Sequence, residues 1–89
     1  MITRVLRVDN EQGLHARPAA AIAKMVSDYS SQGSKVLIGK SEDNLVDASS
    51  VLEILSLKVK NGEDLVIAFD ETFEVEGFLD SLRVILSKK

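Results

Sequence analysis

Residues 13–20, "GLHARPAA", place the only histidine of the chain, His15, two positions before an arginine and three before the only proline. An imidazole titrates near neutrality, so it can act as a nucleophile, a base or a switch. Arg17 carries a permanent charge and a planar fork of donors that suits phosphate oxygens. The pair fits a histidine that carries a phosphoryl group. The same residue types also fit an ordinary polar loop with a solvated arginine, so both interpretations stand at this point.

The rest of the composition excludes several other kinds of site. The chain has no cysteine, which excludes disulfides and thiolate metal ligands. A single histidine near one carboxylate, Glu11, supports neither a metal site nor a Ser-His-Asp hydrolase nor a pair of catalytic carboxylates. We therefore expect no metal and no cofactor. The net charge of −3, with three phenylalanines and one tyrosine, argues against a nucleic-acid partner.

The length of 89 residues suits one domain, which we expect to span 1–89. The opening stretch, "MITRVLRVDN", alternates apolar and charged side chains. It contains neither the apolar centre of a signal peptide nor a span of about 18 apolar residues. Together with the lack of cysteine, this pattern predicts a cytoplasmic protein that does not insert into a membrane.

Hydrophobic periodicity predicts four short strands and three helices. The strands are expected at 3–8, 34–39, 44–48 and 65–69, and the helices at 17–29, at 49–57 and from a cap at Thr72 to Lys88 and Lys89. Two helices with apolar stripes beside four short strands predict an α+β open-faced sandwich, with helices on one face of the sheet and water on the other. Periodicity does not give the order of the strands.

These elements place His15 between the first strand and the first helix, directly before the helix begins. Pro18 suits the first helical turn, where a missing N–H costs nothing. The start of a helix presents free N–H groups and partial positive charge, which stabilise an anion. Gly13 is expected to adopt a backbone conformation closed to other residues, and Leu14 to anchor the loop in the core.

"GLHARPAA" resembles the active-site signature of the HPr family, the histidine-containing phosphocarriers of the bacterial phosphoenolpyruvate-dependent phosphotransferase system, and "SSVLEILSLKVKNGEDLVI" (49–67) resembles the family's second signature. The resemblance covers essentially the whole chain and implies a β-α-β-β-α-β-α order around a four-stranded antiparallel sheet. It implies that His15 accepts phosphate on Nδ1 from phosphorylated enzyme I and passes it to IIA domains of sugar permeases. Arg17 and the helix N–H groups would hold the phosphoryl oxygens. The chain would be a monomeric carrier with no turnover of its own.

The resemblance also implies a docking surface around the histidine, made of Ala16, Ala20, Lys24, Val51 and Leu52. Ala16 and Ala20 have small side chains, so they do not obstruct access to the ring, and Lys24 would attract acidic partners. Val51 and Leu52 match apolar positions that meet enzyme I and the permease domains in the family. The alternatives are a solvated charge for Lys24 and core packing for Val51 and Leu52.

Three positions concern regulation and departures from the family pattern. Ser50 aligns with the family's regulatory serine, the target of an HPr kinase/phosphorylase, but Ser49 stands where relatives often carry a basic residue. Lys58 stands where many relatives have glycine after the short helix, which predicts a different helix ending or mild strain. The segment 36–48 is a few residues longer than the common form.

Two other functions remain as alternatives. One is a regulatory HPr-like protein that works in a phosphorelay without a role in sugar transport. The other, from a different class, is a small α+β binding module that is never phosphorylated. Labelling with phosphoenolpyruvate and enzyme I separates the second from the phosphocarriers.

Overall fold

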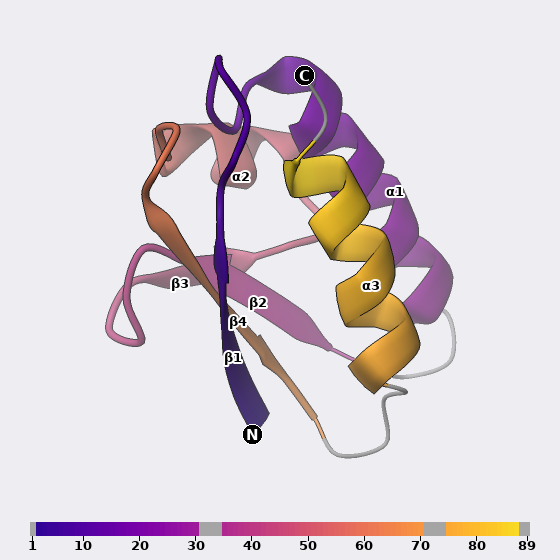
Figure 1. The fold of residues 1–89 in the computed structure, drawn as a ribbon. Helices are drawn as coiled ribbons and strands as arrows, with labels where there is room; N and C mark the ends of the chain where they lie inside the picture. Colours follow the sequence, from indigo (N-terminus) through magenta and orange to yellow (C-terminus); the bar gives the residue numbers. More distant parts are fainter. Residues whose placement is uncertain (1, 31–34, 71–74, 88–89) are drawn as a thin grey trace.

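The computed structural model of the chain describes residues 2–30, 35–70 and 75–87 (Figure 1). The elements follow one another as β1 (Ile2–Arg7), α1 (Ala16–Ser30), β2 (Val36–Gly39), β3 (Leu45–Asp47), α2 (Val51–Ser56), β4 (Asp64–Phe69) and α3 (Val75–Leu86). This is the predicted β-α-β-β-α-β-α order. Within the three described ranges, no helix combines the length and the apolar character needed to cross a membrane.

The four strands form one sheet in the order β1-β4-β2-β3, and each neighbouring pair is antiparallel. The strand β4 is central: Leu65 pairs with Leu6 of β1, and Ile67 pairs with Ile38 of β2. Because successive side chains of a strand point to opposite faces, these paired residues share one face of the sheet. Figure 1 shows α1 and α3 lying side by side against the sheet. The predicted open-faced sandwich is confirmed.

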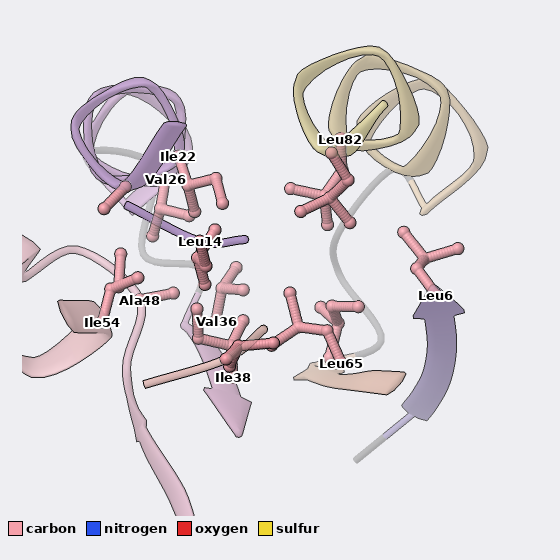
Figure 2. Packing of buried hydrophobic residues seen from close by; sticks show 14 of the residues in the cluster. Leu6, Leu14, Ile22, Val26, Val36, Ile38, Ala48, Ile54, Leu65 and Leu82 are labelled. Carbon is pink, nitrogen blue, oxygen red and sulfur yellow. The ribbon is translucent and has the colours of Figure 1, made fainter. Parts of the chain in front are cut away.

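The core lies between the sheet and the helices α1 and α3 (Figure 2). Ile22 and Val26, one turn apart on α1, are fully buried and lie above Val36 and Ile38 of β2. Leu82 of α3 is also fully buried. Each such side chain contributes roughly 1.5–3 kcal/mol on burial. The apolar stripes read from the helices therefore face the sheet, which holds α1 in a fixed position.

Some predicted boundaries are wrong by one or two residues. The helix α2 is shorter than the predicted range 49–57, because Ser50 caps it from outside. The strand β3 is shorter than the predicted range 44–48, because the N–H of Asn44 is used in the preceding turn, where it donates to the carbonyl oxygen of Ser41 at 3.1 Å. The residues between β2 and β3 therefore form a hairpin loop.

The other elements agree with the prediction more closely. β1, α1 and β4 match their predicted ranges to within one residue at each end. β2 begins at Val36. The predicted strand start at Ser34, the predicted cap Thr72 and the terminal Lys88 and Lys89 lie outside the described residues.

Candidate functional site

His15 caps the start of α1. Its carbonyl oxygen accepts a hydrogen bond from the N–H of Ala19 at 3.0 Å, and the residue is half-buried. The first turn of an α-helix leaves its N–H groups without internal acceptors, and Pro18 has none to offer. The N–H groups of Ala16 and Arg17 therefore have no acceptor within the helix. An anion at this position would lie beside the positive end of the α1 dipole, as the sequence predicts.

The loop before His15 is fixed to three parts of the fold. Leu14 is buried, and Figure 2 shows it between the side chains of α1 and those of β2. Its N–H donates to the carbonyl oxygen of Val59 at 2.9 Å, in the connection between α2 and β4. The N–H of Asp9 donates to the carbonyl oxygen of Leu86 at the end of α3, at 3.0 Å. The predicted anchoring role of Leu14 is confirmed.

Gly13 has a φ of 67°, in the left-handed region that favours glycine. Its α-carbon also packs directly against the backbone of Val59 and Lys60, with no room for a side chain. The unusual conformation predicted from the sequence is confirmed, and the close approach gives glycine a second reason to stand here.

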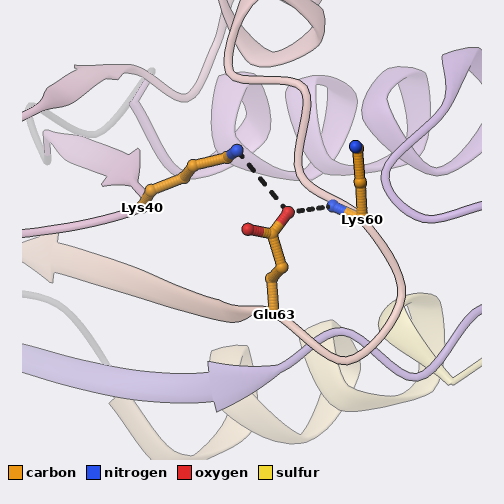
Figure 3. Close-up of polar contacts among 3 residues, drawn as sticks. All are labelled: Lys40, Lys60 and Glu63. Atoms are coloured by element: carbon orange, nitrogen blue, oxygen red, sulfur yellow. Dashed lines mark hydrogen bonds and ion pairs between the residues drawn. The ribbon is translucent and has the colours of Figure 1, made fainter.

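The turn that supports Gly13 is itself held by a carboxylate (Figure 3). Oε1 of Glu63 accepts a hydrogen bond from the backbone N–H of Lys60 at 2.6 Å, and the N–H of Glu63 donates to the carbonyl oxygen of Lys60 at 3.0 Å. Nζ of Lys40, just after β2, lies 3.5 Å from the same Oε1. The N–H of Lys60 and, more weakly, the Lys40 ammonium hold the pKa of Glu63 below its usual value. The ionised carboxylate thus ties the turn to the end of β2.

A surface depression beside His15 brings together residues of the loop, α1 and α3. It is lined by Asn10, Glu11, Gln12, His15, Ala16, Arg17, Pro18, Ala21 and Ile85. The predicted pair, His15 and Arg17, shares this depression with Ala16. Asn10, Gln12 and Ile85 line it without having been predicted. Ile85 lies on the apolar stripe of α3, which indicates burial and carries no signal for a site.

The predicted docking residues lie on two helices. Ala16, Ala20 and Lys24 are exposed at a spacing of four, so they share one face of α1. Of these three, only Ala16 lines the depression. On α2, Leu52 is 79% exposed, whereas Val51 is half-buried and packs against the core. Leu52 is therefore the side chain presented to solvent, and Val51 is shared with the core.

Ser50 caps α2, at the predicted helix start. Its Oγ accepts a hydrogen bond from the N–H of Glu53 at 3.3 Å, and its own N–H donates to the carbonyl oxygen of Asp47 at 3.2 Å. The carboxylate of Asp47 accepts hydrogen bonds from the N–H of Ser49 at 2.9 Å and from its hydroxyl at 2.7 Å, which hold the pKa of Asp47 below its usual value. α2 contacts α1, and Figure 1 shows it at the end of the molecule where α1 begins.

Lys58 follows the end of α2 with a φ of 53°. In the described part of the chain it is the one non-glycine residue in the left-handed region. Its N–H donates to the carbonyl oxygen of Leu55 at 3.2 Å, which closes the helix. Lys58 therefore adopts the left-handed conformation itself, which is less favourable for a residue with a β-carbon than for glycine.

The arrangement suits an anion held next to a nucleophile. His15 and Arg17 line one depression at the start of α1, where the first N–H groups have no acceptor within the helix and an anion is stabilised. Among the residues that the structure describes, no three histidine, aspartate or glutamate side chains gather closely enough to hold a metal ion.

Known proteins are similar to this chain in both sequence and fold. A family model described as "PTS HPr component phosphorylation site" matches residues 2–87. The phosphocarrier protein HPr of Streptomyces coelicolor is 36% identical over 70 residues, which are 79% of this chain and 72% of that protein. The HPr of Haloferax volcanii is 35% identical over 85 residues, 94% of this chain and 91% of that protein. The crystal structure of HPr-C-His from Thermoanaerobacter tengcongensis has a TM-score of 0.80 at 25% identity and covers 100% of this chain and 99% of its own. The chain belongs to the HPr family of phosphocarriers of the phosphotransferase system.

Proposed function

We propose that this chain accepts a phosphoryl group on His15 from phosphorylated enzyme I and passes it to IIA domains of sugar permeases. The observation that carries the proposal is the position of His15, which caps α1 in the same depression as Arg17. A nucleophile, a permanent cation and helix N–H groups without an acceptor in the helix thus border the place where the phosphoryl oxygens would lie.

In the acceptor step, Nδ1 of His15 attacks phosphorus, and the bond between phosphorus and the donor breaks as the new P–N bond forms. The N–H groups of Ala16 and Arg17 and the Arg17 guanidinium stabilise the oxygens of the transferred group. In the donor step the P–N bond breaks as phosphorus forms a bond to the next acceptor. The chain is therefore a carrier that needs no cofactor and has no turnover of its own.

The exposure of the site suits transfer in both directions. His15 is half-buried and Arg17 is exposed, so the phosphoryl group is stabilised by contacts that still leave it open to water and to partners. A deeper site with more fixed donors would hold the group and slow its release. Enzyme I and the IIA domains would approach the same ring in turn, with the chain acting as a cytoplasmic monomer.

The proposed docking surface surrounds this ring. Ala16 and Ala20 leave the helix surface low, and Leu52 offers an exposed apolar side chain on α2. Lys24 adds positive charge on the same face of α1. Val51 contributes the part of its side chain that the core leaves exposed.

Ser50 is the proposed regulatory position, a target for an HPr kinase/phosphorylase. Its hydroxyl caps α2, beside the apolar Leu52. A phosphate there would place nearly two negative charges next to the docking surface. The helix start would accept that charge, whereas an apolar partner surface would not.

The test is phosphorylation with phosphoenolpyruvate and enzyme I. The wild-type chain is expected to take up label that is labile in acid and stable in alkali, and His15→Ala is expected to take up none while keeping its circular dichroism spectrum. Equal labelling of the two proteins would overturn the assignment of His15. Transfer of the label to an IIA domain of a sugar permease separates a transport role from a purely regulatory phosphorelay. A wild-type chain that is never labelled would be a binding module.

A further inference from the structure

Asn10 is the buried polar side chain of the described residues, with 6% of its surface exposed. It lies in the loop that carries His15, and it lines the same depression. Burying an amide is unfavourable unless its polar atoms are hydrogen-bonded. We therefore expect hydrogen bonds to hold this buried asparagine in place beside the reactive histidine.

The hydrogen bonds of Asn10 build the turn that leads to the histidine. Its side-chain Oδ1 accepts from the N–H of Gln12 at 3.0 Å, and its carbonyl oxygen accepts from the N–H of Gly13 at 2.8 Å. An asparagine side chain that bonds to the backbone two residues ahead fixes a tight local conformation. The first of these two bonds depends on the side chain, so a single substitution can remove it.

The turn lies between two points where the loop is tied to the fold. On one side, Asp9 is bonded to Leu86 of α3, and on the other, Leu14 is bonded to Val59 and buried in the core. Between these ties, the path of the backbone is set by Asn10 and Gly13. A change in that path moves the wall of the depression relative to the ring of His15.

We propose that Asn10 is a positioning residue for phosphoryl transfer: its side-chain turn sets the loop that orients His15 toward the N–H groups of Ala16 and Arg17. The inference rests on the proposed function, because it assigns Asn10 a part in the transfer reaction at His15. Transfer between fixed groups is sensitive to displacements on the order of 1 Å. Loss of the turn should therefore slow the reaction more than it weakens the binding of enzyme I.

The test compares Asn10→Ala, Asn10→Asp and, as a matched control, Asn44→Ala. Asp keeps an oxygen acceptor for the N–H of Gln12 but loses the amide N–H donors and adds a charge, whereas Ala removes the acceptor. Asn44 is an exposed asparagine in the hairpin between β2 and β3, and its backbone N–H donates to the carbonyl oxygen of Ser41, a bond that alanine retains. The readouts are the kcat and KM of enzyme I with this chain as the varied phosphoryl acceptor, and the NMR resonances of the His15 ring. Because His15 is the only histidine of the chain, these resonances need no assignment among candidates.

For Asn10→Ala we expect kcat to fall about tenfold with KM nearly unchanged, together with a shift of the His15 ring resonances. Asn10→Asp should recover both readouts toward wild type, and Asn44→Ala should match wild type in both. A kcat for Asn10→Ala within twofold of wild type, or His15 ring resonances unchanged in Asn10→Ala, would overturn the inference.

Two further outcomes stay informative. If Asn10→Ala does not fold, Asn10→Ser is measured in its place. Because the serine hydroxyl is a weaker acceptor, kcat should be several-fold below wild type, with the same shift of the His15 ring resonances. A wild-type kcat for Asn10→Ser would overturn the inference. If enzyme I never labels the wild-type chain, the proposed function fails. The ring resonances of the three variants then still decide whether Asn10 positions His15.

Discussion

Gly13 and Val59 approach each other so closely that a β-carbon on Gly13 would lie 2.5 Å from the carbonyl oxygen of Val59. The same oxygen accepts the N–H of Leu14 at 2.9 Å. The connection between α2 and β4 therefore supports the loop that carries His15, and it does so through backbone contacts. The geometry of the site depends on a segment more than 40 residues away in the sequence.

Gly13→Ala should lower the free energy of unfolding by about 2–4 kcal/mol. Two costs combine: a φ of 67° is unfavourable for alanine, and its methyl group must displace the backbone at Val59. Urea denaturation measures the loss. Gly62→Ala is the matched control, because Gly62 has a φ of 89° but no atom within 4 Å of the added carbon, and it should lose only about 1–2 kcal/mol. Equal losses at the two positions would show that the close approach to Val59 is not a significant constraint.

Arg17→Ala should leave His15 able to accept a phosphoryl group but slow the transfer by about tenfold. It removes a charge-assisted contact worth roughly 1.5–3 kcal/mol when fully formed, and the exposure of Arg17 places the effect at the lower end. Arg17→Lys should restore part of the rate, since lysine lacks the planar fork. Initial rates of labelling by enzyme I measure the effect. Arg4→Ala, which removes the same charge from an exposed position on β1, serves as the control and should transfer at the wild-type rate.

Ser50→Asp should slow phosphorylation of His15 by enzyme I at least several-fold without lowering the melting temperature much. A carboxylate at the start of α2 is compatible with the helix, but it adds charge beside the apolar Leu52, close to Asp47 and Glu53. Ser50→Asn is the neutral control, because it also caps a helix, and it should react at nearly the wild-type rate. If Asp and Asn variants react equally fast at limiting enzyme I, Ser50 serves only as a helix cap.

The stability of the chain should depend on pH through Asp47. Hydrogen bonds from the N–H and the hydroxyl of Ser49 hold the pKa of Asp47 below 3.8, so their contribution is fully present above pH 3.8 and is lost as the pH falls through the lower folded-state pKa. Asp47→Asn should cost about 0.5–1 kcal/mol at neutral pH, a value reduced by solvent exposure. Urea denaturation across the acid range should show this difference shrink toward zero. A difference that is independent of pH would mean that the charge of Asp47 is not involved.

The sequence predicts the local features of this molecule well because their causes are local. His15, Arg17 and Pro18 are neighbours in the chain, so a helix start after the histidine places them together. The order of the strands depends on the pairing of β4 with both β1 and β2, which no single segment encodes. Likewise, Ile85 reaches the depression only because α3 packs beside α1.

Two adjacent apolar residues of α2 show the same limit on a smaller scale. Val51 and Leu52 are adjacent and chemically similar, and the sequence cannot decide which of them packs into the core. In the structure Val51 packs against the core and Leu52 is 79% exposed, because neighbouring positions on a helix point in different directions. Tertiary packing of a six-residue helix, rather than its composition, decides the surface offered to partners.

Lys58→Gly should raise the free energy of unfolding by about 0.5–1 kcal/mol. At a φ of 53° a lysine is strained by roughly 1–2 kcal/mol relative to glycine. Part of the stability gained by removing this strain is lost, because glycine has more conformational freedom in the unfolded chain. Lys58→Ala is the matched control, because it removes the same charge and keeps the β-carbon, so it should leave stability nearly unchanged or slightly lower. Urea denaturation at neutral pH distinguishes the two variants. A glycine variant no more stable than the alanine variant would show that the left-handed conformation at the end of α2 carries no strain, and that the backbone there adjusts to the side chain.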